Sequence, residues 1–407
     1  MNLSLKFAIG IALGGVLISG CVSSVMGYKN VIYDPNAFKQ VAIQKAIEYA
    51  VDPKKIEEDI KNISINFKKV YKDFTQKASK EWGGGEKVAS ASQDVFVKYT
   101  DSYLSRAQVD FNKGIISVAT LDTKEPKVAL KRAIVTTLLT PEDPEGVDLY
   151  SDKGVKYTSK PYLAGLVKDN EGVDVLYQWR ANRYADYLIE NHLKTKQIQE
   201  NGVNKQVHYV QFEMVKDHEV QSENKYANFV ASNAKAYNME EALIFAIIKT
   251  ESHFNPYAVS HIPAYGLMQV VPASAGRDVY RQLNGRDGIP TKEMLFTPHT
   301  NILYGSTYLN ILFSRYLKGI NNKLSHEYCV IAAYNTGSGN VLSVFHKDRK
   351  KAVEMINSMS SSEVYRKLRT SLRYEEARNY LHKVTTAKKE FQTQSASFGV
   401  SKRLAFR

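Results

Sequence analysis

A helix that ends in a carboxylate is the feature that most constrains this chain. Apolar residues recur at helical spacing before Glu251 and predict a helix with one mostly buried stripe. The stripe consists of Ala242, Leu243, Ala246, Ile247 and Thr250. Asn238 is the predicted N-cap, and Glu241, three residues later, completes a capping-box pattern. Pro256 prevents the helix from running much further, so Glu251 falls in or near its last turn.

The position of Glu251 suits a general acid. The partial negative charge of the helix end and burial beside apolar neighbours both oppose ionisation of the carboxyl. A carboxyl that stays protonated near neutral pH can donate a proton to a glycosidic oxygen. Taken alone, such a helix more often carries an exposed surface glutamate. Two downstream segments favour the general acid instead, namely Gly-Leu-Met-Gln-Val at 266–270 and Ala-Tyr-Asn-Thr-Gly at 333–337.

No second carboxylate lies close to Glu251 in the sequence. No Asp or Glu occurs from Ser252 through Arg277, and Asp278, Asp287 and Glu293 are the next that are able to approach in three dimensions. Most glycosidases use two carboxylates that flank the scissile bond. A single carboxylate is instead consistent with a reaction in which the substrate supplies the nucleophile.

The order of these segments resembles the catalytic domain of lytic transglycosylases, which cleave bacterial peptidoglycan. The resemblance covers residues from about 222 to 390, through the run at 251–260, the segments at 266–270 and 333–337, and a closing tyrosine motif at 376–384. Three upstream strings, at 97–101, 147–151 and 185–188, resemble the amino-terminal domain of one membrane-bound subgroup. The implied class is α+β: a mixed α/β amino-terminal domain followed by a mainly α-helical lysozyme-like catalytic domain.

The resemblance also implies a mechanism and a set of residues. Glu251 would act as acid on the bond between N-acetylmuramic acid and N-acetylglucosamine, then as base on the C6 hydroxyl that attacks C1, forming a 1,6-anhydromuramoyl end without water. The positions that would contact sugar or orient Glu251 are Ser260, Gln269, Tyr334, Asn335 and Tyr380. Ordinary helix packing is the other interpretation of the two tyrosines. A hydrolytic muramidase and a non-catalytic peptidoglycan-binding lipoprotein are the alternative functions.

The amino terminus predicts a lipid anchor. Met1–Lys6 is weakly basic and Phe7–Leu17 is apolar, as in a secretory signal peptide covering residues 1–20. Residues 18–21, Ile-Ser-Gly-Cys, resemble a lipobox, which implies that Cys21 is acylated and becomes the new amino terminus. The alternative is a cleaved soluble signal with an incidental cysteine. The residue after the cysteine is Val22. An aspartate there would indicate retention in the inner membrane, so valine predicts that the protein is anchored in the outer membrane and faces the periplasm.

Composition shifts predict the organisation of the rest. The predicted parts are a helical, polar arm (21–94), an α+β domain (95–215), a charged linker (216–223), the catalytic domain (224–390) and a flexible basic tail (391–407). Within them we expect a break at 82–85, a hairpin over 109–118 with its turn at 112–114, a helix over 128–139 and a strand over 207–215. Because the linker lacks an apolar run, a fragment that starts near Ser222 is predicted to fold alone.

The net charge of +13 favours anionic partners. Peptidoglycan stems and membrane phosphates fit that surplus, and a solvated charged surface without a specific partner is the alternative. No nucleic-acid-binding motif is present, and no nucleic-acid partner is expected. His253 and His261 flank the site without a set of ligands at zinc spacing, so neither a metal nor a cofactor is predicted. Cys329, in an apolar stretch, is expected to be a buried core residue.

Overall fold

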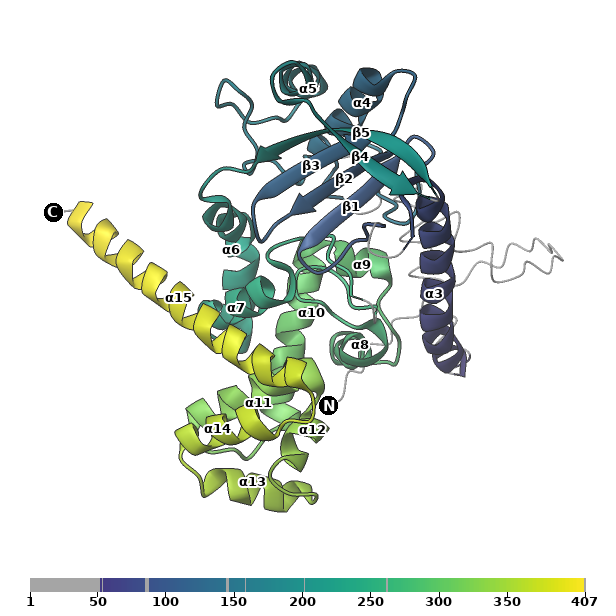
Figure 1. Ribbon diagram of the computed structural model, residues 1–407. Helices are drawn as coiled ribbons and strands as arrows, with labels where there is room; N and C mark the ends of the chain where they lie inside the picture. The colour runs from purple at the N-terminus through teal and green to yellow at the C-terminus, as the bar shows by residue number, and fades with distance from the viewer. Residues whose placement is uncertain are drawn as a thin grey trace, which may run out of the picture.

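The computed structural model describes residue 52 and residues 54–84, 88–143, 146–157, 159–200, 202–260 and 263–405. A sheet with covering helices forms the first half, and an array of helices forms the second (Figure 1). The predicted class, a mixed amino-terminal domain followed by a mainly helical one, is confirmed. The signal peptide, Cys21 and the first part of the predicted arm, up to residue 51, lie outside the described residues. Within the described ranges, no helix is both long enough and apolar enough to cross a membrane.

Five antiparallel strands form one sheet in the order β1-β2-β3-β5-β4. The strands are β1 (Val95–Thr100), β2 (Ser105–Asp110), β3 (Ile115–Thr120), β4 (Lys194–Glu200) and β5 (Val203–Glu213). Asp110 pairs with Ile115 across a turn in which Gly114 has a φ of +65°, which confirms the predicted hairpin. Helices α4 (Pro126–Leu138) and α5 (Gln178–His192) lie between β3 and β4 in the sequence. The predicted helix over 128–139 and the strand over 207–215 are thereby confirmed, although the observed strand begins earlier, at Val203.

Helices cover both faces of the sheet. Alternate strand residues such as Val109, Ile116 and Phe212 are buried in the core that also holds α4 and α5. The opposite face buries Val97, Tyr99 and Val207 against α3 (Lys54–Trp82). Helix α3 ends at Trp82, immediately before Gly83 with a φ of +94°, as the predicted break requires.

Ten α-helices follow the sheet within the described residues. They are α6 (His218–Tyr237), α7 (Glu241–Ser252), α8 (Arg277–Asn284), α9 (Lys292–Phe296), α10 (Pro298–Ile311), α11 (Lys323–Thr336), α12 (Ser338–Ser343), α13 (Arg349–Asn357), α14 (Ser361–Ser371) and α15 (Glu375–Ala405). Helix α7 packs against α6 and the long α15. All six residues from Leu243 through Ile248 are buried, so the predicted single stripe is too narrow: α7 is enclosed nearly all round. Cys329 of α11 is buried, as expected.

The structure differs from the sequence-based expectations at three helix ends. The predicted linker at 216–223 is helical from His218 onward, because its charges lie on the exposed side of α6 while Ser222 and Tyr226 face inward. Asn238 caps the end of α6 in the left-handed conformation, at a φ of +52°, rather than the start of α7. The N-cap of α7 is Glu240, without a side-chain cap. Helix α15 continues through the predicted tail to Ala405, since no proline interrupts it.

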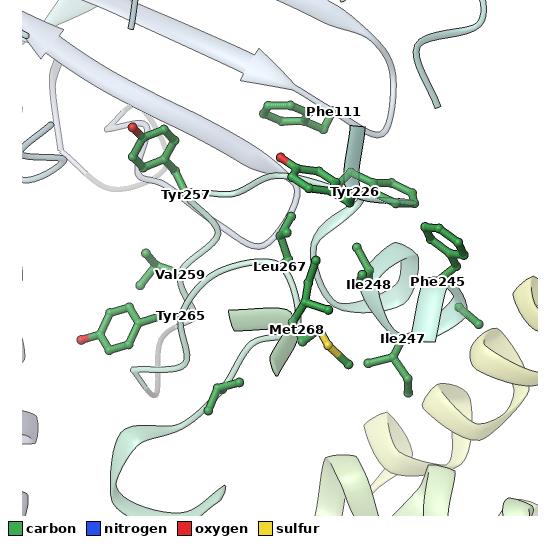
Figure 2. Packing of buried hydrophobic residues seen from close by; sticks show 14 of the residues in the cluster. Phe111, Tyr226, Phe245, Ile247, Ile248, Tyr257, Val259, Tyr265, Leu267 and Met268 are labelled. Carbon is green, nitrogen blue, oxygen red and sulfur yellow. The ribbon is translucent and has the colours of Figure 1, made fainter. Parts of the chain in front are cut away.

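One hydrophobic core runs through both halves of the chain. Figure 2 shows Phe111 from the turn after β2 together with Tyr226 of α6 and Tyr257 from the loop after α7. The Tyr257 ring lies 5.5 Å from Phe96 of β1 and 5.6 Å from Tyr162, centroid to centroid. The two halves therefore share an interior instead of meeting only at a surface.

Candidate active site

Glu251 is the penultimate residue of α7 and is buried, with 7% of its surface exposed. The predicted place in the last turn is confirmed. Two consecutive non-glycine residues with positive φ, His253 at +47° and Phe254 at +64°, end the helix and turn the chain. The Ser252 hydroxyl lies within hydrogen-bond distance of two carbonyls, 3.0 Å from Ile248 and 2.8 Å from Leu267. These contacts fix the end of α7 to the loop that follows it.

The carboxyl of Glu251 is held largely in its protonated form near neutral pH. Its pKa is raised from 4.5 to about 8, mainly by burial and to a smaller extent by the negative charge of Glu376. The Tyr380 hydroxyl opposes this increase by approaching the carboxyl as a hydrogen-bond donor. Among the described residues, that hydroxyl has no partner at ordinary hydrogen-bond length and angle, so it lies near the carboxyl without making a full hydrogen bond. Tyr334 of α11 also lies close to Glu251: burial raises the pKa of its phenol, and the charge of the Glu251 carboxylate adds to that increase.

The loop after α7 makes a close turn at Gly266. Its φ is +74°, and a Cβ there would lie 2.3 Å from the Leu295 carbonyl oxygen and 2.4 Å from Asn301 Nδ2. Asn301 of α10 holds this turn in place through two hydrogen bonds. Its Oδ1 accepts the Met268 N–H at 2.7 Å, and its Nδ2 donates to the Tyr265 carbonyl at 2.7 Å. Glycine is therefore required at position 266 for both conformation and space.

Leu267 and Met268 follow the turn and point into the core. Both are fully buried, as predicted, and Figure 2 shows them beside Ile247 and Ile248 of α7. The Tyr334 hydroxyl donates to the Met268 carbonyl at 2.8 Å, so α11 also fixes this loop.

Gln269 adopts a positive φ of +47° and is buried. Its Nε2 donates to the carbonyls of Ala258 and Gly266, each at 3.0 Å. Its Oε1 has no hydrogen-bond partner within the described residues. The nitrogen is thus used to hold the loop together, and the oxygen is the atom left to accept a bond.

The remaining candidates lie at different distances from this centre. Asn335, next to Tyr334, donates from Nδ2 to Glu376 Oε1 at 3.5 Å, which joins the end of α11 to the start of α15. Ser260 is used within its own loop, where its Oγ accepts the Ala264 N–H at 3.2 Å. The structure brings Tyr334 and Tyr380 to Glu251, joins Asn335 to the same helix as Tyr380, and places Gln269 in the adjoining turn.

The acidic residues considered from the sequence are occupied elsewhere. Asp278 accepts from the Tyr316 hydroxyl at 2.8 Å, and Asp287 forms paired hydrogen bonds with Arg277 and Arg281. Those guanidinium groups hold the pKa of Asp287 well below its usual range. Glu293 lies next to Lys292 on α9. The carboxylate whose charge acts on Glu251 is Glu376, to which no role was assigned from the sequence. Its spacing of four residues before Tyr380 on one helix is the signal that would have found it.

The amino-terminal half supports the loop that leaves Glu251. Asn255 Nδ2 donates to the Gln93 carbonyl at 3.2 Å, and its Oδ1 accepts the Tyr257 N–H at 3.0 Å. The Val259 N–H donates to the Ser92 carbonyl at 3.3 Å. The Tyr257 hydroxyl donates to the Pro141 carbonyl at 2.5 Å. Sequence reasoning missed this support because it depends on contacts between distant segments.

Comparisons with known proteins cover both halves. Residues 55–225 match the family described as membrane-bound lytic murein transglycosylase C, N-terminal domain, and residues 228–357 match the transglycosylase SLT domain. A Klebsiella pneumoniae protein named membrane-bound lytic murein transglycosylase C is 43% identical over 320 residues, which is 78% of this chain and 87% of that protein. A Yersinia pestis protein of the same name is 42% identical over 78% of this chain and 88% of its own length. The 70-kDa soluble lytic transglycosylase of Escherichia coli has 22% identity and a TM-score of 0.31, over 42% of this chain and 25% of that one.

Proposed function

Because the chain belongs to the membrane-bound lytic murein transglycosylase C family, we propose that Glu251 is the single acid and base of its reaction. The protein is a peptidoglycan lytic transglycosylase. The observation that carries the proposed role is one buried carboxyl, with a pKa raised to about 8, between the two phenols of Tyr334 and Tyr380.

The reaction proceeds in two proton transfers. Glu251 first donates its proton to the oxygen of the β-1,4 bond as that oxygen leaves C1 of N-acetylmuramic acid. The C6 hydroxyl of the same sugar then bonds to C1, and the Glu251 carboxylate takes the hydroxyl proton. The acid is restored, a 1,6-anhydromuramoyl end is formed and no water is consumed. One group serves both steps best when its pKa lies near the working pH, which agrees with a value of about 8.

The surrounding residues have separate tasks in this proposal. The Tyr380 hydroxyl stabilises the carboxylate that forms when the proton leaves, since it is placed to donate a hydrogen bond to that group. The free Oε1 of Gln269 and the side-chain amide of Asn335 are assigned to hydroxyl or acetamido groups of the sugar. Tyr334 orients the loop through Met268, and Ser260 holds the far end of the same loop.

The protein is associated with a membrane, as the family name states. We assign the anchor to acylated Cys21 and the location to the periplasmic face of the outer membrane, on the residues at 18–22. Metabolic labelling with a palmitate analogue tests this: Cys21→Ser is expected to lose the label. Equal labelling of the variant and the parent would contradict the assignment.

Glu251→Gln tests the acid. The amide keeps the size of the side chain but has no proton to transfer, so we expect turnover to fall by at least about 10²-fold with folding retained. Glu241→Gln is the matched control, because Glu241 is exposed in the first turn of the same helix. Mass spectrometry of fragments from purified sacculi identifies the products, since anhydro ends are one water lighter than the reducing ends of a muramidase. Near-parental turnover in Glu251→Gln, or reducing ends from the parent, would refute the proposed mechanism.

A further inference from the structure

Glu376 lies at a junction of the two helices that face Glu251. It is exposed in the first turn of α15, one helical turn before the buried Tyr380, so the two side chains share a face of the helix. Asn335, at the end of α11, donates to its Oε1 at 3.5 Å. Negative charge is favoured in the first turn of a helix, because the free N–H groups there carry partial positive charge.

The charges around Glu251 are few. Helix α15 packs against α7, and from it the Tyr380 hydroxyl and the charge of Glu376 act on Glu251, while Tyr334 lies close to it on α11. Within the described residues, no lysine or arginine is among the groups whose charges act on it. Lys249, two residues away on α7, is paired with Glu219 at 3.0 Å and Glu390 at 3.3 Å.

We propose that Glu376 is a positioning residue for the reaction: its negative charge, held beside the site by Asn335, keeps the proton on Glu251 between turnovers. The inference rests on the proposed role of Glu251. A like charge makes Glu251 a weaker acid and a stronger base. It therefore assists the second step, in which the carboxylate recovers its proton from the C6 hydroxyl. Burial supplies most of the raised proton affinity, and Glu376 adds to it.

Three variants separate the charge of Glu376 from its other properties. Glu376→Gln removes the charge and keeps an oxygen that accepts from Asn335, while Glu376→Asp retains the charge. Glu375→Gln is the matched control, since it removes one negative charge from the neighbouring exposed residue of the same helix turn. For each variant, the pH dependence of kcat/KM on isolated glycan strands reports the proton affinity of the acid in the free enzyme.

The carboxyl carbon of Glu251 gives a second readout that does not need turnover. In protein labelled with ¹³C-glutamate, its resonance is assigned by its absence from Glu251→Gln and is followed against pH. We expect Glu376→Gln to lower the Glu251 midpoint by at least about half a pH unit, whereas Glu375→Gln shifts it less and Glu376→Asp restores it. Because Glu376 is exposed, salt is expected to lower the midpoint in the parent and to have little effect in Glu376→Gln.

The outcomes distinguish this inference from the function on which it rests. An identical Glu251 titration in Glu376→Gln and the parent overturns the inference, as does an equal shift in Glu375→Gln. Substantial activity in Glu251→Gln refutes the proposed function, whatever the titration shows. A shifted midpoint with an unshifted pH–rate profile also overturns the inference, because the charge would then act on Glu251 without affecting the reaction.

Discussion

The two sides of the candidate site are built differently. On one side, α11 and α15 present side chains to Glu251, namely Tyr334, Tyr380 and the charge of Glu376. On the other side, the described parts of the loop after α7, residues 255–260 and 263–270, bury most of their side chains and are held by backbone and amide hydrogen bonds. The helical side acts on the proton affinity of Glu251, whereas the loop side fixes the position of the backbone. Substitutions on the loop side should therefore affect stability most, and those on the helical side the pH profile.

The largest effect is expected from deleting the amino-terminal half, which supports the loop side of the site. The contacts of Tyr257 with Phe96 and Tyr162 reverse the expectation that a fragment starting near Ser222 folds alone. Each large buried ring contributes about 1.5–3 kcal/mol through burial, and the fragment would expose several of them. We expect weak thermal cooperativity, dye binding typical of exposed apolar surface, and no turnover. The control is the chain from residue 52 to the end. A fragment that melts like this control would show that the two halves are independent.

The local features of the site were predictable from the sequence, and the long-range ones were not. The end of α7 was found because apolar spacing and Pro256 act within a few residues. The capping role of Asn238 was misassigned, since the same residue suits the start of one helix and the left-handed end of another. Asn301 and the supporting carbonyls of Ser92 and Gln93 could not be found, because only the folded chain brings them to the loop.

Gly266→Ala tests the loop side alone. The added Cβ meets the Leu295 carbonyl and Asn301 in a left-handed backbone conformation, so we expect a loss of roughly 2–5 kcal/mol in unfolding free energy. Gly285→Ala is the matched control, because its φ of +64° is similar but, among the described residues beyond its own chain neighbours, nothing lies within 4 Å of the new Cβ. Its expected loss is roughly 1 kcal/mol, from conformation only. Urea denaturation measures both, and equal losses would mean that the close turn does not constrain the loop.

Glu251→Gln tests how the buried carboxyl affects the unfolding free energy of the protein. The pKa of Glu251 is about 8 in the folded chain and near 4.5 as a reference, so the folded state binds the proton more tightly. The associated stability is complete below pH 4.5 and is lost as the pH rises through about 8. The side chain of the variant cannot ionise at this position. Above pH 8 we therefore expect the unfolding free energy of the variant to rise relative to that of the parent by up to a few kcal/mol, because each tenfold difference in proton affinity corresponds to about 1.4 kcal/mol. Parallel stability curves from pH 5 to 9 would show that the fold does not raise the proton affinity of Glu251.

Tyr380→Phe tests the helical side. Its hydroxyl donates toward the Glu251 carboxylate, so its removal should raise the pKa of Glu251 and move the alkaline limb of kcat/KM to higher pH. We expect turnover to fall by roughly tenfold or more, because the hydrogen bond that the hydroxyl would form to the carboxylate during the reaction contributes about 1.5–3 kcal/mol. Tyr374→Phe, at an exposed residue just before α15, is the control. An unshifted limb with lowered turnover would indicate a role in sugar contact alone.

Tyr334→Phe is expected to have the smallest effect. Compared with Tyr380→Phe, it distinguishes the loop side of the site from the helical side by the same chemical change. Tyr334 and Tyr380 are both phenols facing Glu251, but the Tyr334 hydroxyl donates to the Met268 carbonyl of the loop, at 2.8 Å. Its removal leaves that carbonyl without this donor and should lower the unfolding free energy by about 1 kcal/mol. The ring stays in place, so the pH profile of kcat/KM should match that of the parent. Tyr380→Phe should behave in the opposite way, moving the pH profile with little loss of stability at pH 5, since its hydroxyl makes no full hydrogen bond. If both substitutions move the same quantity, the division between a side that sets proton affinity and a side that sets geometry is wrong.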